Sequence, residues 1–197
     1  PNTPHIMRGI AATTNTLALM EMSTGELDAA EALFKESLAQ RNALSDHFYA
    51  AASNNNLGIL EEKRGNTFTA IEYYEAALAI FQGPFDFRQE LDTQTTQLIA
   101  SSNTPTLKLT QALNTLNNIA VMLDHEGREE LAEIYWRNYL LFEEAIPSVL
   151  KVAQAKHNLG RMLMAQGQYT ESLELLFAAT QSFTDLNNTD WLATSLI

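Results

Sequence analysis

Hydrophobic and polar residues recur along this chain with the spacing of amphipathic helices, and the same pattern occurs four times. In each copy an apolar residue is followed eight positions later by a glycine. A small residue comes five positions after that glycine, and a bulky one nine positions after it. A glycine permits a tight turn between two periodic segments. The pattern therefore predicts four helical hairpins that turn at Gly25, Gly65, Gly127 and Gly167.

The small and bulky positions of each copy indicate how the hairpins pack. Small residues let the two helices of a hairpin approach closely, and they are Ala30, Ala70, Ala132 and Ser172. Bulky residues fill the space between one hairpin and the next, and they are Phe34, Tyr74, Trp136 and Leu176. Two short helices cannot bury their apolar faces alone, so hairpins of this kind stack on one another. We therefore predict an all-α fold.

The second copy resembles a tetratricopeptide repeat most closely, through Asn56-Leu57-Gly58, Gly65, Ala70-Ile71-Glu72-Tyr73-Tyr74 and Ala77-Leu78. The fourth copy is similar, whereas Ala18 and Ala120 replace the family's packing glycine in the first and third, and Tyr139 stands where a small residue is usual. The resemblance covers most of residues 11–186. It implies an α-solenoid, a right-handed superhelix of four hairpins in a single domain of residues 1–197, with repeats at about 11–44, 51–84, 113–146 and 153–186.

The spacing of the turn glycines indicates a longer form of the repeat. Gly25 and Gly65 are 40 residues apart, as are Gly127 and Gly167, whereas the common tetratricopeptide repeat has about 34 residues. Each hairpin is therefore expected to be lengthened. A HEAT or armadillo solenoid, with repeats of about 40 to 47 residues, is the alternative, but the glycine turns and the small-residue register favour the tetratricopeptide form.

The interval between the second and third hairpins is irregular. Gly65 and Gly127 are 62 residues apart, 22 more than the other intervals, so we expect an insertion at about 85–112. Within it, Phe87, Leu91 and Leu98 recur at helical spacing and predict an extra helix at about 85–100, followed by a loop. The insertion is either a plain surface segment or a cap on the inner groove. Residues 189–197 predict the start of a further or capping helix.

Composition excludes several classes of function. The 24 acidic and 12 basic side chains give a net charge of −12, which repels nucleic-acid phosphates and anionic membrane surfaces. No run of about twenty apolar residues predicts a membrane span. The absence of cysteine excludes disulfides and thiolate metal sites but does not distinguish a cytoplasmic from an exported bacterial protein. The start at Pro1 and the apolar end at 191–197 suggest a piece of a longer protein.

Catalytic chemistry is not indicated by any motif. The four histidines match no metal-ligand pattern, and the adjacent residues Asp124-His125-Glu126 point in different directions on a helix. A glycine-rich phosphate loop and a nucleophile elbow are both missing from the sequence. We therefore predict a protein that is not an enzyme and has no cofactor and no metal.

The resemblance implies that the first helix of each hairpin lines a concave surface. The candidate peptide-binding residues on that surface are Asn15, Asn55, Asn56, Asn117, Asn118, His157, Asn158 and Arg161. A carboxamide offers both donors and an acceptor, which match the N–H and C=O groups of an extended peptide. The alternative is that these asparagines only satisfy neighbouring helix groups, and that Arg161 pairs with a carboxylate of the chain itself instead of one from a ligand.

The function predicted from these features is a non-catalytic scaffold that binds a peptide segment of a partner protein, either basic or polar-apolar, in the concave groove. One alternative is a peptide- or ligand-sensing module of a bacterial regulator. Another is a structural segment that self-associates by stacking through its C-terminal helix.

Overall fold

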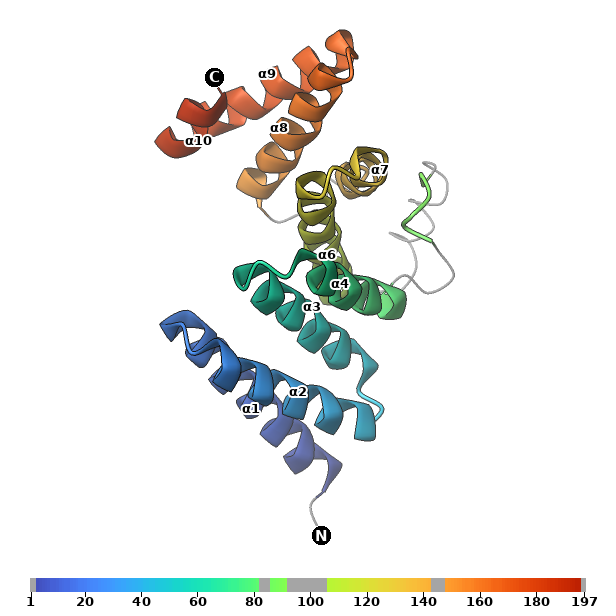
Figure 1. Cartoon of the computed structure of the whole chain (residues 1–197), viewed down its shortest axis with the longest axis vertical. Helices are drawn as coiled ribbons and strands as arrows, with labels where there is room; N and C mark the ends of the chain where they lie inside the picture. The colour runs from blue at the N-terminus through green and yellow to red at the C-terminus, as the bar shows by residue number, and fades with distance from the viewer. Residues whose placement is uncertain (1–2, 82–85, 92–105, 143–147, 196–197) are drawn as a thin grey trace. The chain divides into compact units, whose positions relative to one another are not determined.

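The computed structural model describes residues 3–81, 86–91, 106–142 and 148–195, and all regular structure within these ranges is helical (Figure 1). The chain divides into two compact units, Pro1–Phe85 and Asp86–Ile197. The first unit contains α1 (Pro4–Thr24), α2 (Leu27–Ala43), α3 (His47–Lys63) and α4 (Thr67–Phe81). The second contains α6 (Thr106–His125), α7 (Glu129–Leu140), α8 (Val149–Ala165), α9 (Tyr169–Asp185) and α10 (Thr189–Ser195).

Four helical hairpins account for eight of these helices, as the repeat pattern predicts. In the first unit α1 packs along α2, α3 packs along α4, and α2 also packs on α3. In the second unit α6 packs along α7, and α8 packs along α9. The predicted all-α fold of stacked hairpins is confirmed within each unit. The prediction that the two units form one continuous domain stays a prediction.

The turn glycines have the backbone conformation that their role requires. Gly25, Gly65, Gly127 and Gly167 have φ values of 90°, 79°, 70° and 81°. This left-handed region is costly for residues that carry a Cβ atom. Each hairpin therefore turns at the residue that the sequence pattern indicates.

The core of the first unit lies at the crossing of its helices. Ala18, Ala30 and Phe34 are fully buried together with Leu57 and Leu60, and Tyr73 packs against them. This arrangement confirms the predicted roles, because small residues occupy the crossing and the bulky Phe34 fills the space toward the second hairpin.

Gly58 shows why the crossing of α3 and α4 excludes side chains. A Cβ atom at this position would lie 2.5 Å from the ring of Tyr74, which is itself fully buried. Real Cβ contacts are not that short, so α3 and α4 could not keep this separation with any other residue at position 58. The bulky residue of the second repeat thus packs directly on its glycine.

The core of the second unit continues into α10. Trp191 and Leu192 of α10 pack against Ala153 of α8 and Phe183 of α9. The predicted further helix near residues 189–197 is therefore present as α10, and its apolar side chains are used for packing within the unit.

The first helices begin earlier than the sequence prediction placed the repeats. They begin at residues 4, 47, 106 and 149, instead of about 11, 51, 113 and 153. The additional residues of the 40-residue repeat thus lengthen the first helix of each hairpin at its N-terminal end. Residues 106–112 consequently belong to α6 and not to the insertion.

The helix predicted at about 85–100 is not formed in the part that the structure describes. Residues 86–91 form a turn and irregular backbone, and 92–100 lie outside the described residues. The physical reason is visible in Asn138 of α7. Its amide nitrogen donates to the carbonyl oxygens of Phe87 and Gln89 at 2.9 and 2.8 Å, and its Oδ1 accepts from the N–H of Leu91 at 2.9 Å. These bonds hold the backbone groups in a non-helical path.

Candidate functional site

The candidate residues of the first unit lie on α1 and α3, the first helices of its two hairpins. Asn56 donates a hydrogen bond from Nδ2 to Oδ1 of Asn15, at 3.2 Å. Both side chains are half-buried, so the two carboxamides form part of a surface. Asn55 is buried, with 7% of its surface exposed, and therefore lies beneath that surface. The structure thus brings Asn15 and Asn56 together and leaves Asn55 in the interior.

The candidate residues of the second unit gather around one pocket of about 390 Å³. It lies among α6, α7, α8 and α10, and Asn117, His157, Asn158 and Arg161 of the predicted set all line it. Asn118 is half-buried next to Asn117 but is not part of the lining. The remaining lining residues are Val121, Asp124, His125, Trp136, Gln154 and Trp191.

Sequence reasoning missed three informative members of this pocket. Asp124 lies seven residues after Asn117 and so falls on the same face of α6. Gln154 precedes Asn158 by one helical turn, which is also a recognisable signal. Trp191 could not be placed in this way, because its position depends on how α10 packs against α8 and α9.

Arg161 is paired within the pocket. Its guanidinium donates to a carboxylate oxygen of Asp124 on the neighbouring first helix. The Arg161 side chain is 56% exposed and that of Asp124 is 15% exposed. The sequence left two roles open for Arg161. The structure shows the one in which it pairs with an acidic residue of the chain itself.

His157 is an uncharged member of the pocket at neutral pH. It is 6% exposed and its ring makes edge-on contacts with Trp191 and Phe183, at centroid distances of 5.6 and 6.3 Å. Burial lowers the pKa of His157, and the positive charge of Arg161 lowers it further. The imidazole therefore offers one donor and one acceptor without a charge.

Three residues of this pocket carry a buried polar atom that has no hydrogen-bond partner among the described residues. The atoms are Oδ1 of Asn117, Nε1 of Trp136 and Nδ1 of His157. Buried polar groups in proteins are nearly always satisfied, so each such group needs an explanation. All three atoms are closed to solvent, so a ligand in the pocket would reach them only if the side chains around them moved.

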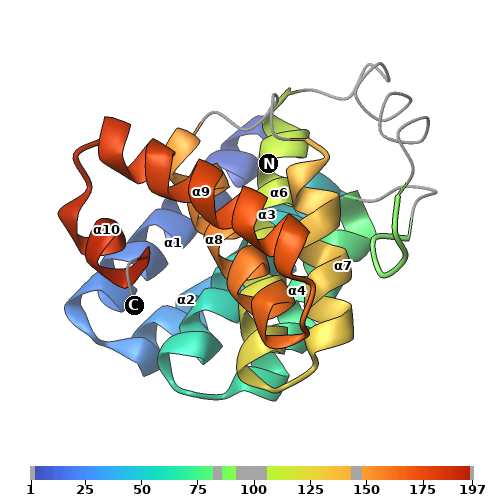
Figure 2. The ribbon, with the colours of Figure 1, turned by 90° about the horizontal axis from the view of Figure 1, so that it is seen from above.

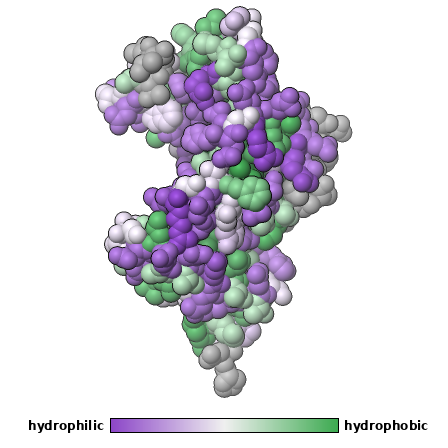
Figure 3. All heavy atoms as spheres, viewed as in Figure 1, coloured by the Kyte–Doolittle hydropathy of each residue, from purple (hydrophilic) through white to green (hydrophobic). Residues whose placement is uncertain are grey.

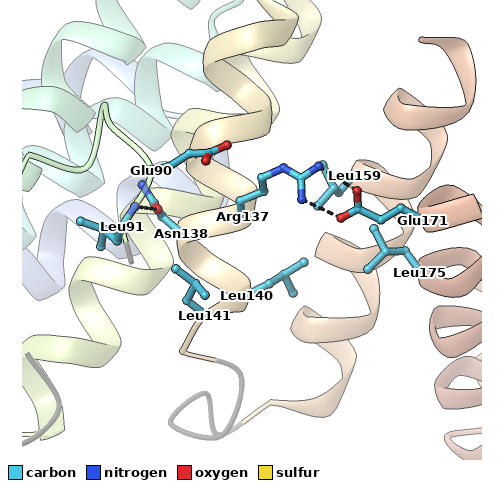
Figure 4. A pocket seen from close by; sticks show the side chains of 9 residues that line it. All are labelled: Glu90, Leu91, Arg137, Asn138, Leu140, Leu141, Leu159, Glu171 and Leu175. Atoms are coloured by element: carbon cyan, nitrogen blue, oxygen red, sulfur yellow. Dashed lines mark hydrogen bonds and ion pairs between the residues drawn. The ribbon is translucent and has the colours of Figure 1, made fainter. Parts of the chain in front are cut away.

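A second pocket, of about 340 Å³, differs because its polar groups bind one another (Figure 4). Arg137 points to Glu171, and Asn138 points to the backbone of Leu91. Much of the remaining wall is leucine. With their polar groups already paired, these residues hold α7, α9 and the segment 86–91 together, and the pocket offers less to a polar ligand than the first.

The part of the chain that the structure describes contains no group of three or more histidine, aspartate or glutamate side chains placed to hold a metal ion. The described helices include none that is both long and apolar enough to cross a membrane.

Comparisons with known proteins agree with this architecture. Two family models, both described as tetratricopeptide repeat, match residues 9–83 and 152–176. No curated protein sequence matches the chain. The crystal structure of BtubC (BKLC) from P. vanneervenii is similar, with a TM-score of 0.70, 18% identity, and coverage of 94% of this chain and 66% of that one.

The crystal structure of the apo form of RapI is also similar, with a TM-score of 0.70 and 15% identity over 98% of this chain and 47% of that chain. The chain thus spans just under two thirds and about half of the length of these two proteins. Identities this low establish a shared fold only. With repeat matches in both of its units and the helical hairpins described above, the chain belongs to the tetratricopeptide repeat family.

Proposed function

We propose that this chain is a non-catalytic protein-interaction module that binds an extended peptide segment of a partner on its first helices. Scaffolding of protein partners is the general role of tetratricopeptide repeats. The observation that carries the specific proposal is the pocket of the second unit, which is lined by Asn117, His157, Asn158 and Arg161 from two neighbouring first helices.

The half-buried carboxamide side chains of Asn117, Gln154 and Asn158 line the pocket and favour an uncharged amide as the ligand. A carboxamide offers both hydrogen-bond donors and an acceptor. A peptide unit presents a C=O acceptor and an N–H donor close together, so a backbone amide can pair with such a side chain.

Charge limits the kind of peptide that binds. Arg161 is neutralised by Asp124, and the chain carries a net charge of −12. An acidic peptide would meet a repulsive field, whereas a neutral or basic one would be attracted and would associate faster. The bound segment is therefore expected to be polar-apolar or basic.

The test is to select, from a displayed library of random nine-residue peptides, those that bind the wild-type chain. Calorimetric titration then measures the affinity of each selected peptide. Asn117→Leu and Asn158→Leu each remove a carboxamide that lines the pocket but keep the shape of the side chain. Both variants should weaken binding at least tenfold. Asn42→Ala, at an exposed position of α2, is the control and should bind like the wild type.

Circular dichroism of each variant checks that the helices are retained. Failure to select any peptide would contradict the proposed function. Selection of peptides that bind Asn117→Leu and Asn158→Leu as tightly as the wild type would contradict the assignment of the pocket.

A further inference from the structure

The first helices of the second unit, α6 and α8, are joined by two hydrogen bonds in one register. Nζ of Lys151 donates to Oδ1 of Asn114 at 2.6 Å, and the guanidinium of Arg161 donates to the carboxylate of Asp124. In both pairs the two residues are 37 positions apart in the sequence. A helix rises about 1.5 Å per residue, so the two bonds lie about 15 Å apart along α8. The two helices therefore run in the same direction and are joined at two levels.

The pocket of the second unit lies between these two bonds. The same register pairs Asn117 with Gln154 and Val121 with Asn158, and all four residues line the pocket. Neither of these two pairs is hydrogen-bonded in the structure, whereas the levels on both sides are closed by a cation. We call this surface the α6–α8 channel, and it extends from Lys151 at one end to Arg161 at the other.

The second helix α9 leaves the channel side of α8 uncovered. Lys151, Gln154 and Arg161 follow one another at helical spacing and so share one side of α8. The carbonyl of Gly160 lies on the other side and accepts a hydrogen bond from Ser172 of α9 at 2.7 Å. Figure 2 shows α9 in front of α8, and the two helices pack along each other. The channel is therefore bounded by first helices alone along its length.

Charge is unevenly divided between the helices of this unit. The surface in Figure 3 is mostly hydrophilic, but its colours do not distinguish acidic from basic residues. The second helices are acidic, because α7 carries three glutamates and one arginine, and α9 carries two glutamates and one aspartate. In contrast, α8 carries Lys151, Lys156 and Arg161 and no acidic residue. One wall of the channel is thus positive in a chain whose net charge is −12.

The two cations at the ends of the channel differ in their partners. Arg161 is neutralised by Asp124. Lys151 is exposed and donates to a neutral amide, and no carboxylate of a described residue lies within ion-pair distance of its ammonium group. An ammonium group has three N–H donors, of which the bond to Asn114 uses one. Lys151 therefore has a positive charge and donors that a carboxylate of a ligand can use.

We propose that a peptide bound along the α6–α8 channel carries an acidic side chain that pairs with Lys151, in a segment that is otherwise polar-apolar or basic. This inference rests on the proposed function and adds a requirement at one position of the peptide. Lys151 and Asn158 are seven residues, or about 10 Å, apart along α8. An extended peptide advances about 3.3 Å per residue. The acidic residue is therefore expected about three residues from the one that faces Asn158.

The pair with Lys151 should contribute more to the choice of peptide than to affinity. An exposed ion pair is screened by water and stabilises a complex only a little. Loss of the pair should therefore weaken binding by about two- to fivefold, and high salt should reduce this difference. Because the other end of the channel is neutral, one acidic residue also fixes the direction in which the peptide binds.

Selection of nine-residue peptides on the wild type and on Lys151→Glu tests the proposal. Peptides selected on the wild type should share an aspartate or glutamate at one position, and those selected on Lys151→Glu should have a lysine or arginine there. The selected peptides are synthesised with acetylated and amidated ends, so that side chains supply all of their carboxylates. Circular dichroism of each variant should show unchanged helices, because Lys151 is exposed.

Calorimetric titration then measures the pair directly. Replacing the shared acidic residue of the peptide by its amide should weaken binding to the wild type by about two- to fivefold and should not change binding to Lys151→Gln. Lys35→Gln is the matched control, because it removes one positive charge from an exposed position of α2 and should respond like the wild type.

The outcomes separate this inference from the proposed function. Selected peptides without a shared acidic position would overturn the inference and leave the proposed function standing. An equal loss of affinity on the wild type and on Lys151→Gln would do the same. Failure to select any peptide would contradict the proposed function and this inference with it.

Discussion

Arg137 of α7 and Glu171 of α9 form a two-bond ion pair between the second helices of the third and fourth hairpins. Nη1 lies 2.6 Å from Oε1 and Nη2 lies 3.0 Å from Oε2. Arg137 also donates from Nε to Glu133 at 2.8 Å, on its own helix. The hydrogen bonds from Arg137 lower the pKa of Glu171, and those to Glu171 raise the pKa of Arg137. The guanidinium thereby links the second helices of the two hairpins of the second unit.

Glu171→Gln should lower the free energy of unfolding by about 0.5–1 kcal/mol, because it removes the charge from one partner of a paired group. The expected loss of stability is small because the Glu171 side chain is 43% exposed and solvent screens the pair. Urea unfolding at pH 7 and low salt measures it, and the loss should shrink at high salt. Asp86→Asn is the control, since its pair with Arg88 is exposed and local. An equal loss of stability in both variants would show that the pair between α7 and α9 stabilises the fold no more than an exposed local pair does.

Replacing each of two buried tyrosines by phenylalanine should change the free energy of unfolding in opposite directions. Tyr139 is 1% exposed, its hydroxyl has no partner among the described residues, and burial raises its pKa to about 12. Tyr139→Phe removes an unsatisfied group and should raise the unfolding free energy by up to about 1 kcal/mol. The Tyr74 hydroxyl donates a hydrogen bond to Glu62 at 3.0 Å, so Tyr74→Phe should lower the free energy of unfolding by about 1 kcal/mol. Thermal unfolding of both variants checks the signs, and a loss in Tyr139→Phe would indicate a satisfied hydroxyl.

Gly58→Ala should destabilise the first unit by about 1–3 kcal/mol, because the new Cβ would lie 2.5 Å from the Tyr74 ring and the helices would have to separate. Gly9→Ala is the matched control. Gly9 is also within a helix, but a Cβ there meets nothing within 4 Å, so alanine should stabilise by up to about 1 kcal/mol through helix propensity. Denaturant midpoints measure both effects. Stabilisation by both substitutions would contradict the close packing at Gly58.

The sequence was sufficient to predict features that depend on local chemistry and on the repeat. The turns at the four glycines, the close approach at Gly58 and the burial of Trp136 all follow from positions that recur in each copy. The starts of the first helices were predicted too late although two of them carry local signals, with Pro4 in the first turn of α1 and Ser148 as the N-cap of α8. Alignment to a 34-residue repeat places the boundary too late.

Features that depend on tertiary contacts could not be predicted in this way. The path of residues 86–91 is set by Asn138, 47 residues or more further along the chain. Helical spacing of Phe87 and Leu91 predicted a helix there, but the buried amide of Asn138 uses their backbone groups. The pocket likewise depends on Trp191, which reaches His157 only after α10 has packed. Local periodicity contains no information about such contacts.

His157 gives the pocket a measurable dependence on pH. Burial, and then the charge of Arg161, lower its pKa in the folded chain, whereas the unfolded histidine titrates near about 6.5. As the pH falls below that value, the unfolded state takes up a proton that the folded state does not, so folding stability is lost until the pH reaches the lowered pKa of the folded state.

The wild type should therefore lose stability between pH 7.5 and 5.5, measured as the urea midpoint, and His157→Gln should lose less over the same interval. The difference between the wild type and His157→Gln is the quantity that reports His157. Equal slopes in both proteins would show that the imidazole is not held neutral by its contacts with Trp191 and Phe183.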